Sequence, residues 1–549
     1  MEKSAKSKFR FTKPEKSWIM YDWANSIYAT NIMAAIFPIL YTAVADDVGS
    51  KWYGVGVSVA SLVIAVLAPF LGTLGDFKGM KKKLFSFFLV LGVVFTALIA
   101  VAIVTSDWRI MLLGYILSRV GFSGSCLFYD SFLTDVTTDE RMDKVSAWGY
   151  AMGYIGGSTI PFLISIGVLL LTDYSQFGQI FSILIVSVWW IVFSIPMLKN
   201  VHQVHYVERP EGTNVAKAGW KNFLSTARAI LTNPGLLIFV LAYFFYIDGV
   251  DTVISVSTNY GSTLGLGSTG MILALVVTQV VAVPFSILFS RLSEKVGSVK
   301  MIIVAVAVYV GICCVGFCMG SMVEPYQMEY ADTVRVSAEA NAPAFASAAD
   351  KGVWEDVVSD LTETGRESLY AETAAERVAN FHEGSDSVFG GVLTRLNDPE
   401  NVVYVFENDE DRKAAAAAVE LIWADCEPLA ADAGKLDGYV DATGTASLLF
   451  WVLATLVGTV QGGIQALSRS YFGKLIPAER SNEFFGFFDV FGKFAAVVGP
   501  LLYSLGYMIS GRASVGILSL ILLFVCGACL LIFGGKKIAE TERIARSAE

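Results

Sequence analysis

Two apolar stretches of the chain carry acidic and amide side chains one helical turn apart. The stretch YDWANSIYAT places Asp22 and Asn25 on one helix face, and the stretch IDGVDTVISV places Asp248 and Asp251 on the corresponding face of another, because successive residues turn by about 100°. Hydrocarbon leaves such groups unsatisfied, so ionisable residues in apolar helices normally face a bundle interior or a water-filled cavity. The four residues therefore predict two polar stripes that line a cavity and bind a small polar solute or an ion.

For Asp22 a second interpretation stays open. This residue lies between Tyr21 and Trp23 and only a few residues into its apolar run. Aromatic residues are enriched in this way where a helix passes the membrane surface. Asp22 is therefore either part of a cavity wall or part of such an aromatic belt.

Further charged side chains lie within apolar runs, where a central charge costs about 2.5–3.5 kcal/mol on insertion scales. They are Arg119, Asp130, Arg469, Asp489 and Lys493. Arg binds carboxylates in a bidentate manner and stays charged, whereas Asp can lose its charge and so carry a coupling proton. The mixture fits a zwitterion, with an acid for its ammonium and Arg469 for its carboxylate, and it fits other small polar solutes almost as well. Asp489 and Lys493 are spaced i,i+4 with the acid first, so a structural ion pair is their alternative role.

The sequence offers no pattern for a metal centre or a cofactor. Cys313, Cys314 and Cys318 lie close together, but in an apolar run they are expected to pack as small hydrophobic residues. The three histidines lie outside the apolar runs. Neither a nucleophile with its base nor a GxxxxGK[ST] phosphate loop is evident. We therefore expect no metal, no cofactor and no enzymatic activity, and an ion gradient as the energy source.

Long apolar helices must position these side chains. The 549 residues are 54% hydrophobic and 16% charged, with a mean hydropathy of +0.58, whereas soluble domains are about 25% charged. About 20 apolar residues cross a hydrocarbon core of about 30 Å. Twelve runs reach this length, near residues 17–45, 52–74, 84–105, 110–134, 146–171, 177–197, 234–260, 269–290, 301–322, 447–473, 484–509 and 514–534. The sequence thus predicts an all-α integral membrane protein with twelve transmembrane helices.

The distribution of Lys and Arg predicts the orientation of these helices. The two termini and the loops on their side hold 26 Lys and Arg residues, whereas the short loops on the other side hold only Lys51, Arg109 and Arg512. Basic residues are retained on the cytoplasmic side of a membrane. We therefore expect cytoplasmic N- and C-termini.

One loop on the opposite side differs from the others. Residues 323–446 contain 26 acidic and 8 basic residues, and apolar and aromatic residues recur among them. The recurrence favours a small folded domain over a disordered loop. Much of its composition is helical, and NVVYVF is a candidate short strand. We expect an acidic extracytoplasmic insert between helices 9 and 10.

The chain repeats itself. YDWANSIYAT corresponds to IDGVDTVISV at an offset of 226 residues, and the loop GTLGDFKGMKKK corresponds to SRLSEKVGSVKM at an offset of 218. GYIGGSTIP corresponds to GKFAAVVGP at an offset of 339, an increase that matches the size of the insert. Two parallel six-helix repeats are therefore expected, with the solute path between them.

This pattern predicts five regions. They are an N-terminal six-helix half (1–197), a cytoplasmic linker (198–233), helices 7–9 (234–322), the acidic insert (323–446), and helices 10–12 with a cytoplasmic tail (447–549).

The loop GTLGDFKGMKKK resembles the G-x-L-x-D-x-x-G signature of the major facilitator superfamily, although Phe77 replaces the usual basic residue. The segments YDWANS, YAMGYIGG, QALSRS and EFFGFFDVFGKFAAVVGP resemble the branch that includes the yeast autophagy-related vacuolar amino-acid effluxer and many bacterial proteins. The resemblance covers both halves, and it implies the major facilitator fold and an amino acid or small peptide as the substrate. No counterpart of residues 323–446 is known in that branch.

The resemblance also implies a gate. In the superfamily the loop acid, here Asp76, pairs with basic groups across the bundle and holds one face of the transporter closed. The matching positions in the two copies are Gly72, Asp76, Gly79, Lys82, Glu294 and Gly297.

Together these features predict a secondary active transporter that works by alternating access, driven by a proton or sodium gradient. Its expected partners are a small polar solute, the coupling ion and the lipid bilayer, with no nucleic acid, and its expected location is a bacterial cell membrane. A non-transporting membrane sensor that binds a ligand with residues 323–446 is the alternative.

Overall fold

The computed structural model describes residues 9–45, 47–208, 215–368, 373–398 and 402–548. These residues are helical nearly throughout, and their one β contact is an isolated bridge between Phe77 and Val207. The all-α prediction is therefore confirmed. The strand expected at NVVYVF is absent from the described residues 402–406, which form bends and extended chain.

The described part of the chain contains ten helices that are long and apolar enough to cross a membrane, or eleven if the bent pair Val55–Ala68 and Phe70–Asp76 is one span. The first predicted span, 17–45, is broken into α1 (Lys13–Ile27), a π-helical turn η1 (Tyr28–Ala34) and α2 (Ile36–Val44). The break falls at Ala35, whose φ of −127° and ψ of −69° leave the helical region. No piece of this stretch alone is long enough to count as a span.

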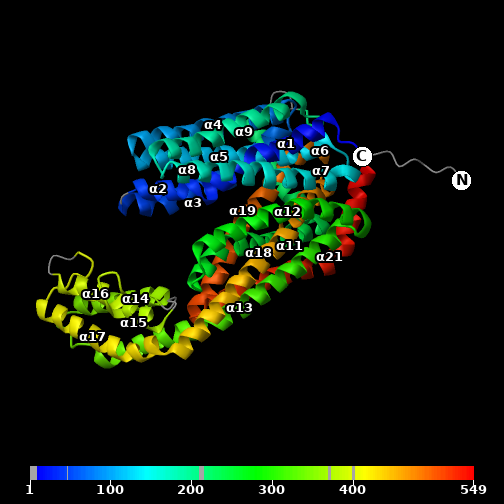
Figure 1. Ribbon diagram of the computed structural model, residues 1–549. Coiled ribbons are helices and arrows are strands. Elements are labelled where there is room, and N and C mark those ends of the chain that lie inside the picture. The colour runs from blue at the N-terminus through cyan, green and yellow to red at the C-terminus, as the bar shows by residue number, and fades with distance from the viewer. Residues whose placement is uncertain (1–8, 46, 209–214, 369–372, 399–401, 549) are drawn as a thin grey trace.

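The helices form two bundles that lie side by side (Figure 1). The N-terminal bundle contains α1, α3 (Asp47–Asp76), α4 (Met80–Thr105), α5 (Trp108–Ser131), α7 (Asp139–Met152), η2 (Gly153–Thr159), α8 (Ile160–Leu171) and α9 (Gln176–Asn200). The C-terminal bundle contains α11 (Pro234–Thr263), α12 (Ser268–Val296), α13 (Ser298–Asn341), α18 (Ala433–Leu475), α19 (Ser481–Ser510), α20 (Ala513–Ser519) and α21 (Ile521–Ala548). Each bundle buries its own apolar core, so each packs as a unit.

The segment between the bundles runs along one end of the molecule. Residues 201–208 follow α9 as extended chain, and α10 (Val215–Thr232) leads into α11. At this end α1 begins and α21 ends (Figure 1). We call it the closed end, because the described hydrogen bonds and ion pairs between the bundles involve the parts of the helices that lie toward it.

Residues 323–446 project from the opposite end of the C-terminal bundle (Figure 1). Here α13 and α18 continue past the predicted spans, and α14 (Ala348–Ser368), α15 (Ala374–His382), α16 (Val388–Asn397) and α17 (Asp409–Ala431) lie between them. Their buried side chains, among them Trp354, Phe381, Phe389 and Ile422, join the core of the C-terminal bundle. The predicted boundaries at 322 and 447 therefore fall inside continuous helices.

Candidate functional site

A buried arginine on α18 joins the two bundles. Arg469 Nη1 donates to Asp130 Oδ1 at 2.9 Å, and Nη2 donates to Asp22 Oδ2 at 3.3 Å. Nε donates to Ser146 Oγ at 3.0 Å, and Nη2 also approaches the Ser146 carbonyl oxygen at 3.2 Å. The guanidinium on the C-terminal bundle thus contacts α1, α5 and α7 of the N-terminal bundle.

Aromatic rings enclose this guanidinium. Its central carbon lies 4.7 Å from the ring centroid of Trp18, 5.4 Å from that of Tyr129 and 4.4 Å from that of Tyr150. Guanidinium groups are attracted to aromatic faces at such distances. The Tyr129 hydroxyl also donates to Asp22 Oδ2 at 2.6 Å, so the same ring orients the carboxylate that Arg469 contacts.

Gly149 on α7 makes the close approach possible. A Cβ atom at this position would lie 2.3 Å from Asp22 Oδ2 and 3.2 Å from Arg469 Nη2. Any larger residue would therefore push the acid and the arginine apart.

A cavity of about 240 Å³ lies between the bundles beside this cluster. It is lined by Leu127, Asp130, Tyr150, Tyr243, Ile247, Asp251, Gln465, Arg469, Phe485, Phe488, Asp489 and Gly492. Four of these are residues that the sequence predicted for the site: Asp130, Asp251, Arg469 and Asp489. The rings of Tyr243 and Phe488 stack in the wall with their centroids 3.9 Å apart.

Other predicted residues lie away from this wall. Asp22 is behind Arg469, and Asn25 donates to Cys126 Sγ at 3.7 Å inside the N-terminal bundle. Asp248 is fully buried in the C-terminal bundle, where the Thr252 hydroxyl donates to its Oδ1 at 3.5 Å. Its Oδ2 has no hydrogen-bond partner among the described residues. The side chain of Lys493, and with it the predicted contact to Asp489, lies outside the described residues.

Arg119 has a partner within its own bundle. Its Nη1 donates to the Tyr115 hydroxyl one turn earlier on α5, and its guanidinium carbon lies 5.8 Å from that ring's centroid. It does not line the cavity.

At the closed end, Asp76 at the end of α3 caps the first turn of α19. Asp76 Oδ1 accepts from the Asn482 backbone N–H at 2.9 Å and from Asn482 Nδ2 at 2.8 Å, and Oδ2 accepts from the Glu483 N–H at 3.1 Å. A carboxylate at a helix N-terminus satisfies free N–H groups and favours the helix dipole. The hydrogen-bond partners of Asp76 are thus a helix terminus and an amide, not the basic side chains that the resemblance implies.

The glycines of this loop fit the same contact. A Cβ at Gly72 would lie 2.4 Å from the Asn482 carbonyl oxygen, so a side chain there would separate α3 from α19. Gly79 has a φ of +72°, which glycine adopts readily, and it is where the chain turns into α4. Gly297 in the second copy has a φ of +98° at the matching turn into α13.

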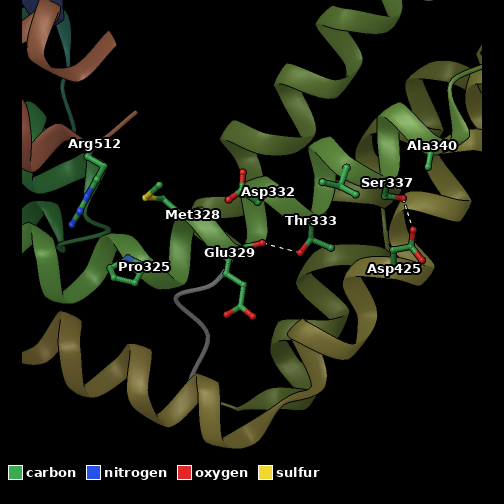
Figure 2. A pocket seen from close by; sticks show the side chains of 10 residues that line it. Pro325, Met328, Glu329, Asp332, Thr333, Ser337, Ala340, Asp425 and Arg512 are labelled. Atoms are coloured by element: carbon green, nitrogen blue, oxygen red, sulfur yellow. Dashed lines mark hydrogen bonds between the residues drawn. The ribbon is translucent and has the colours of Figure 1, made fainter. Parts of the chain in front are cut away.

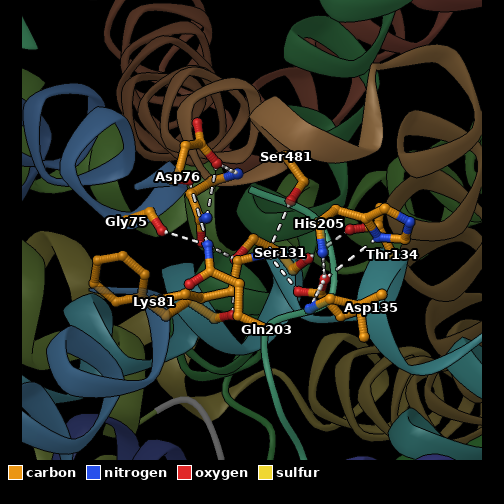
Figure 3. Close-up of polar contacts among 12 residues, drawn as sticks. Gly75, Asp76, Lys81, Ser131, Thr134, Asp135, Gln203, His205 and Ser481 are labelled. Atoms are coloured by element: carbon orange, nitrogen blue, oxygen red, sulfur yellow. Dashed lines mark hydrogen bonds and ion pairs between the residues drawn. The ribbon is translucent and has the colours of Figure 1, made fainter. Parts of the chain in front are cut away.

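Lys81, one residue before the predicted Lys82, crosses to the other bundle (Figure 3). Its Nζ lies 2.6 Å from Asp135 Oδ2 and 2.9 Å from Ser481 Oγ, and neither Lys81 nor Asp135 is exposed. Lys82 instead donates to the Val201 carbonyl oxygen at 2.8 Å, within the N-terminal half. In the described contacts it is therefore Lys81, and not the predicted Lys82, that reaches the other bundle.

The segment 201–208 covers this contact (Figure 3). Gln203 Nε2 donates to the Gly75 carbonyl oxygen at 3.1 Å, and its Oε1 accepts from the Gly79 N–H at 2.9 Å. The N–H groups of Val204 and His205 both donate to Asp135 Oδ1 at 2.8 Å. The Asp135 carboxylate, 3.4 Å from the imidazole Nδ1, raises the pKa of His205.

The second loop makes a different contact. Asp143 on α7 accepts from Ser293 Oγ at 3.1 Å and Ser298 Oγ at 2.8 Å in and after the loop, and its Oδ1 lies 2.6 Å from Lys474 Nζ. Glu294 pairs with Lys144 across the bundles at 2.8 Å. Two sets of contacts therefore fasten the closed end.

Figure 2 shows a second cavity, of about 800 Å³, where α13 leaves the C-terminal bundle. Arg512, in the turn between α19 and α20, lies 2.9 Å from Glu324, and Asp425 on α17 accepts from Ser337 Oγ at 2.5 Å. These contacts tie α17 and the turn to α13, so the cavity is a groove at a structural junction.

Sequence reasoning missed the aromatic part of the site. Tyr150, Tyr243, Phe485 and Phe488 line the cavity, and Trp18 and Tyr129 enclose Arg469. The run EFFGFFDVF does place aromatic residues one turn before Asp489, but the same spacing is common in helices that only pack against lipid or protein. The aromatic lining therefore had no distinctive signal.

Comparisons with known proteins agree with this architecture. The family model described as "Vacuole effluxer Atg22 like" matches residues 51–142, 134–330 and 445–540. The uncharacterized MFS-type transporter YxiO of Bacillus subtilis (strain 168) is 35% identical over 537 residues, which cover 95% of this chain and 95% of that protein. Autophagy-related protein 22 of Yarrowia lipolytica is 26% identical over 136 residues, 21% of this chain and 23% of that protein.

Solved structures share the fold. The E. coli fucose:proton symporter superposes with a TM-score of 0.53 at 10% identity over 95% of this chain and 97% of that one. A bacterial homologue of the iron transporter ferroportin, in an outward-facing state, superposes with a TM-score of 0.50 at 9% identity over 95% and 98%. At such identities the likeness concerns the fold alone.

Proposed function

Because the chain belongs to the Atg22-like family of major facilitator transporters, we propose that it moves a small polar solute, such as an amino acid or a small peptide, by alternating access. Membership makes it a multi-pass membrane transporter. What we propose beyond this membership is the class of solute, the coupling to an ion gradient and the alternating-access mechanism.

The observation that carries it is the 240 Å³ cavity between two bundles whose described hydrogen bonds and ion pairs to each other lie toward one end. Charged and aromatic residues of both bundles line this cavity, as expected for a solute site in such folds. Buried ion pairs and a capped helix close the end beyond it. A rocking motion that breaks these contacts and joins the bundles at the other end would expose the cavity alternately to the two sides.

We assign the coupling proton to Asp248. A buried carboxylate with an unpartnered oxygen costs free energy when it is charged, and a bound proton removes that charge. If the bundles' motion changes the hydration of Asp248, the proton is released on one side and taken up on the other.

Flux measurements test this proposal. Protein in proteoliposomes is given amino acids, dipeptides and sugars, with and without an imposed pH gradient. We expect gradient-driven accumulation of at least one solute, and we expect Asp248→Asn to abolish accumulation while counterflow continues. Asp386→Asn, at an exposed position in the insert, is the control. Accumulation by Asp248→Asn at the wild-type level would refute the role of Asp248, and no flux of any solute would refute the transporter.

We further propose that the closed end is cytoplasmic and that residues 323–446 lie outside. Burial raises the pKa of the Cys426 thiol to about 12, so this native cysteine should stay unlabelled by maleimide wherever the insert lies. Ser385→Cys, at an exposed position, should react with an impermeant maleimide in intact cells. Labelling only after permeabilisation would reverse the orientation.

A further inference from the structure

The guanidinium of Arg469 already has partners on every nitrogen. Nε, Nη1 and Nη2 contact Ser146, Asp130 and Asp22, and rings cover its faces. The two carboxylates more than neutralise its one positive charge. A solute carboxylate would have to displace one of them, so Arg469 joins the bundles more readily than it binds an anion.

The opposite wall of the cavity has the reverse character. Asp251 on α11 lines the cavity, and its carboxylate makes no hydrogen bond or ion pair that the described residues supply. Another acid, Asp248, lies about one turn earlier in the same helix. Asp251 is therefore an anionic group that faces the cavity without a cation of its own.

Aromatic faces accompany this acid. Tyr243 and Phe488 stack in the wall, and Tyr150 borders both the cavity and Arg469. Arg469 is the one base among the described side chains that line the cavity, and Asp130 and Asp22 already contact it, so the carboxylate of Asp251 adds a negative charge to the wall. A negative potential together with aromatic faces attracts organic cations, and it repels anions.

We propose that the cavity selects its solute by a positively charged nitrogen, which Asp251 and the aromatic wall bind, and that a carboxylate on the solute is not required. This inference rests on the proposed function and names its substrate class as organic ammonium compounds, including amines without an acid group. It departs from the zwitterion pattern, in which Arg469 binds a carboxylate.

Charged thiol reagents measure this preference without knowledge of the natural solute. Gln465→Cys places a thiol in the cavity wall, and the full-length protein reacts in detergent with a trimethylammonium-ethyl or a sulfonatoethyl methanethiosulfonate. Mass spectrometry follows modification at residue 465 itself, so the seven native cysteines do not interfere. Rates are divided by those with 2-mercaptoethanol, which corrects for intrinsic reactivity.

We expect the cationic reagent to react at least tenfold faster than the anionic one and to saturate with concentration, as for a reagent that binds before it reacts. Asp251→Asn in the same background should reduce the ratio at least threefold and remove the saturation, whereas Asp386→Asn should change neither. Leu127→Cys, on the wall formed by the other bundle, repeats the measurement in case loss of the 3.0 Å contact between Tyr154 and Gln465 disturbs the fold.

The possible outcomes separate the two proposals. A ratio near one, a preference for the anion, or no effect of Asp251→Asn overturns the cation selectivity and leaves the transporter proposal standing. If neither reagent reaches residue 465 or 127 while Ser385→Cys on the surface reacts, no open cavity exists and the proposed site itself is wrong.

Discussion

The loop after α3 and the loop after α12 occupy matching places in the two bundles, yet they hold the closed end with opposite arrangements of charge. In the first, the acid is on the loop: Asp76 accepts hydrogen bonds from the start of α19. In the second, the acid is on the facing helix: Asp143 on α7 accepts from Ser293 and Ser298. The loop acid of the second copy, Glu294, lies at the rim with a side chain 47% exposed.

This difference shows which property of the contact both copies retain. In each, one carboxylate that is nearly inaccessible to solvent receives several donors from the other bundle, and a buried lysine lies close by. Charge-assisted hydrogen bonds of this kind are strong when formed and costly to leave unmade. The position of the acid is free to change, provided that donor and acceptor remain matched across the bundles.

The largest effect is expected for the buried lysines. Lys81→Met leaves Asp135 without its cation in a site closed to solvent, and loss of one partner of a buried pair costs about 3–5 kcal/mol. Lys474→Met should cost a similar amount at Asp143. Thermal unfolding of the purified variants measures both, with Lys83→Met at an exposed position as the control. Equal melting temperatures for Lys81→Met and Lys83→Met would show that the ion pair between Lys81 and Asp135 does not stabilise the folded protein.

Removal of the helix cap should have a smaller effect. Asp76→Ala exposes the N–H groups of Asn482 and Glu483, and loss of an N-cap costs about 0.5–2 kcal/mol. Because this contact exists only while the end is closed, the variant should also make the cysteine of Ser481→Cys, at a buried position of the same contact, react faster with a maleimide. Asp76→Asn keeps one acceptor and should lie between Asp76→Ala and the wild type. Unchanged reactivity in both would mean that the cap does not hold the gate.

The first contact should also depend on pH, through His205. Its pKa is raised by Asp135, so the stabilisation is complete below the unfolded pKa of about 6.5 and is lost as the pH rises through the higher folded value. The melting temperature of the wild type should therefore exceed that of His205→Gln at pH 5.5, and the difference should shrink toward pH 8.5. His202→Gln, close to Lys82 but not to Asp135, is the control. A difference independent of pH would assign His205 to packing alone.

The smallest effect is expected at the rim. Glu294→Gln removes an ion pair whose members are 47% and 20% exposed, and such pairs contribute about 0–1 kcal/mol. Its melting temperature and its flux should stay close to those of the wild type, and raising the salt concentration should remove what difference there is. A decrease in melting temperature as large as that of Asp76→Ala would mean that Glu294 and Asp76 stabilise the closed end equally.

The sequence was informative about these regions to different degrees. Apolar length and the repeats predicted the two bundles, because burial in a bilayer leaves few alternatives to helices. Asp130 and Arg469, at the same offset as GYIGGSTIP and GKFAAVVGP, do meet in the structure. Pseudo-symmetry predicted equal roles for Asp22 and Asp248, but among the described side chains an arginine lies opposite Asp22 and none pairs with Asp248. Which partner a stripe meets depends on the other bundle, and the spacing within one helix contains no information about it.

The contacts of residues 201–208 were also beyond sequence reasoning. Gln203 and His205 lie in a polar linker without periodicity, and their partners are backbone atoms and a carboxylate far away in the chain. The acidic residues 323–446 were predicted as a small folded domain inserted between helices 9 and 10. In the structure two unbroken helices carry them, a continuity that a change in composition at residue 323 conceals.

Because α13 and α18 continue without a break into residues 323–446, these residues follow any movement of the C-terminal bundle. The helix α13 runs to Asn341, 19 residues past the predicted end of its span at residue 322, which corresponds to about 28 Å of helix. A turn of about 10° in the C-terminal bundle would move the end of a lever of this length by about 5 Å. If the bundles rock as proposed, a fluorophore at Ser385 paired with one on the N-terminal bundle would convert each movement into a change of distance that single-molecule measurements can follow.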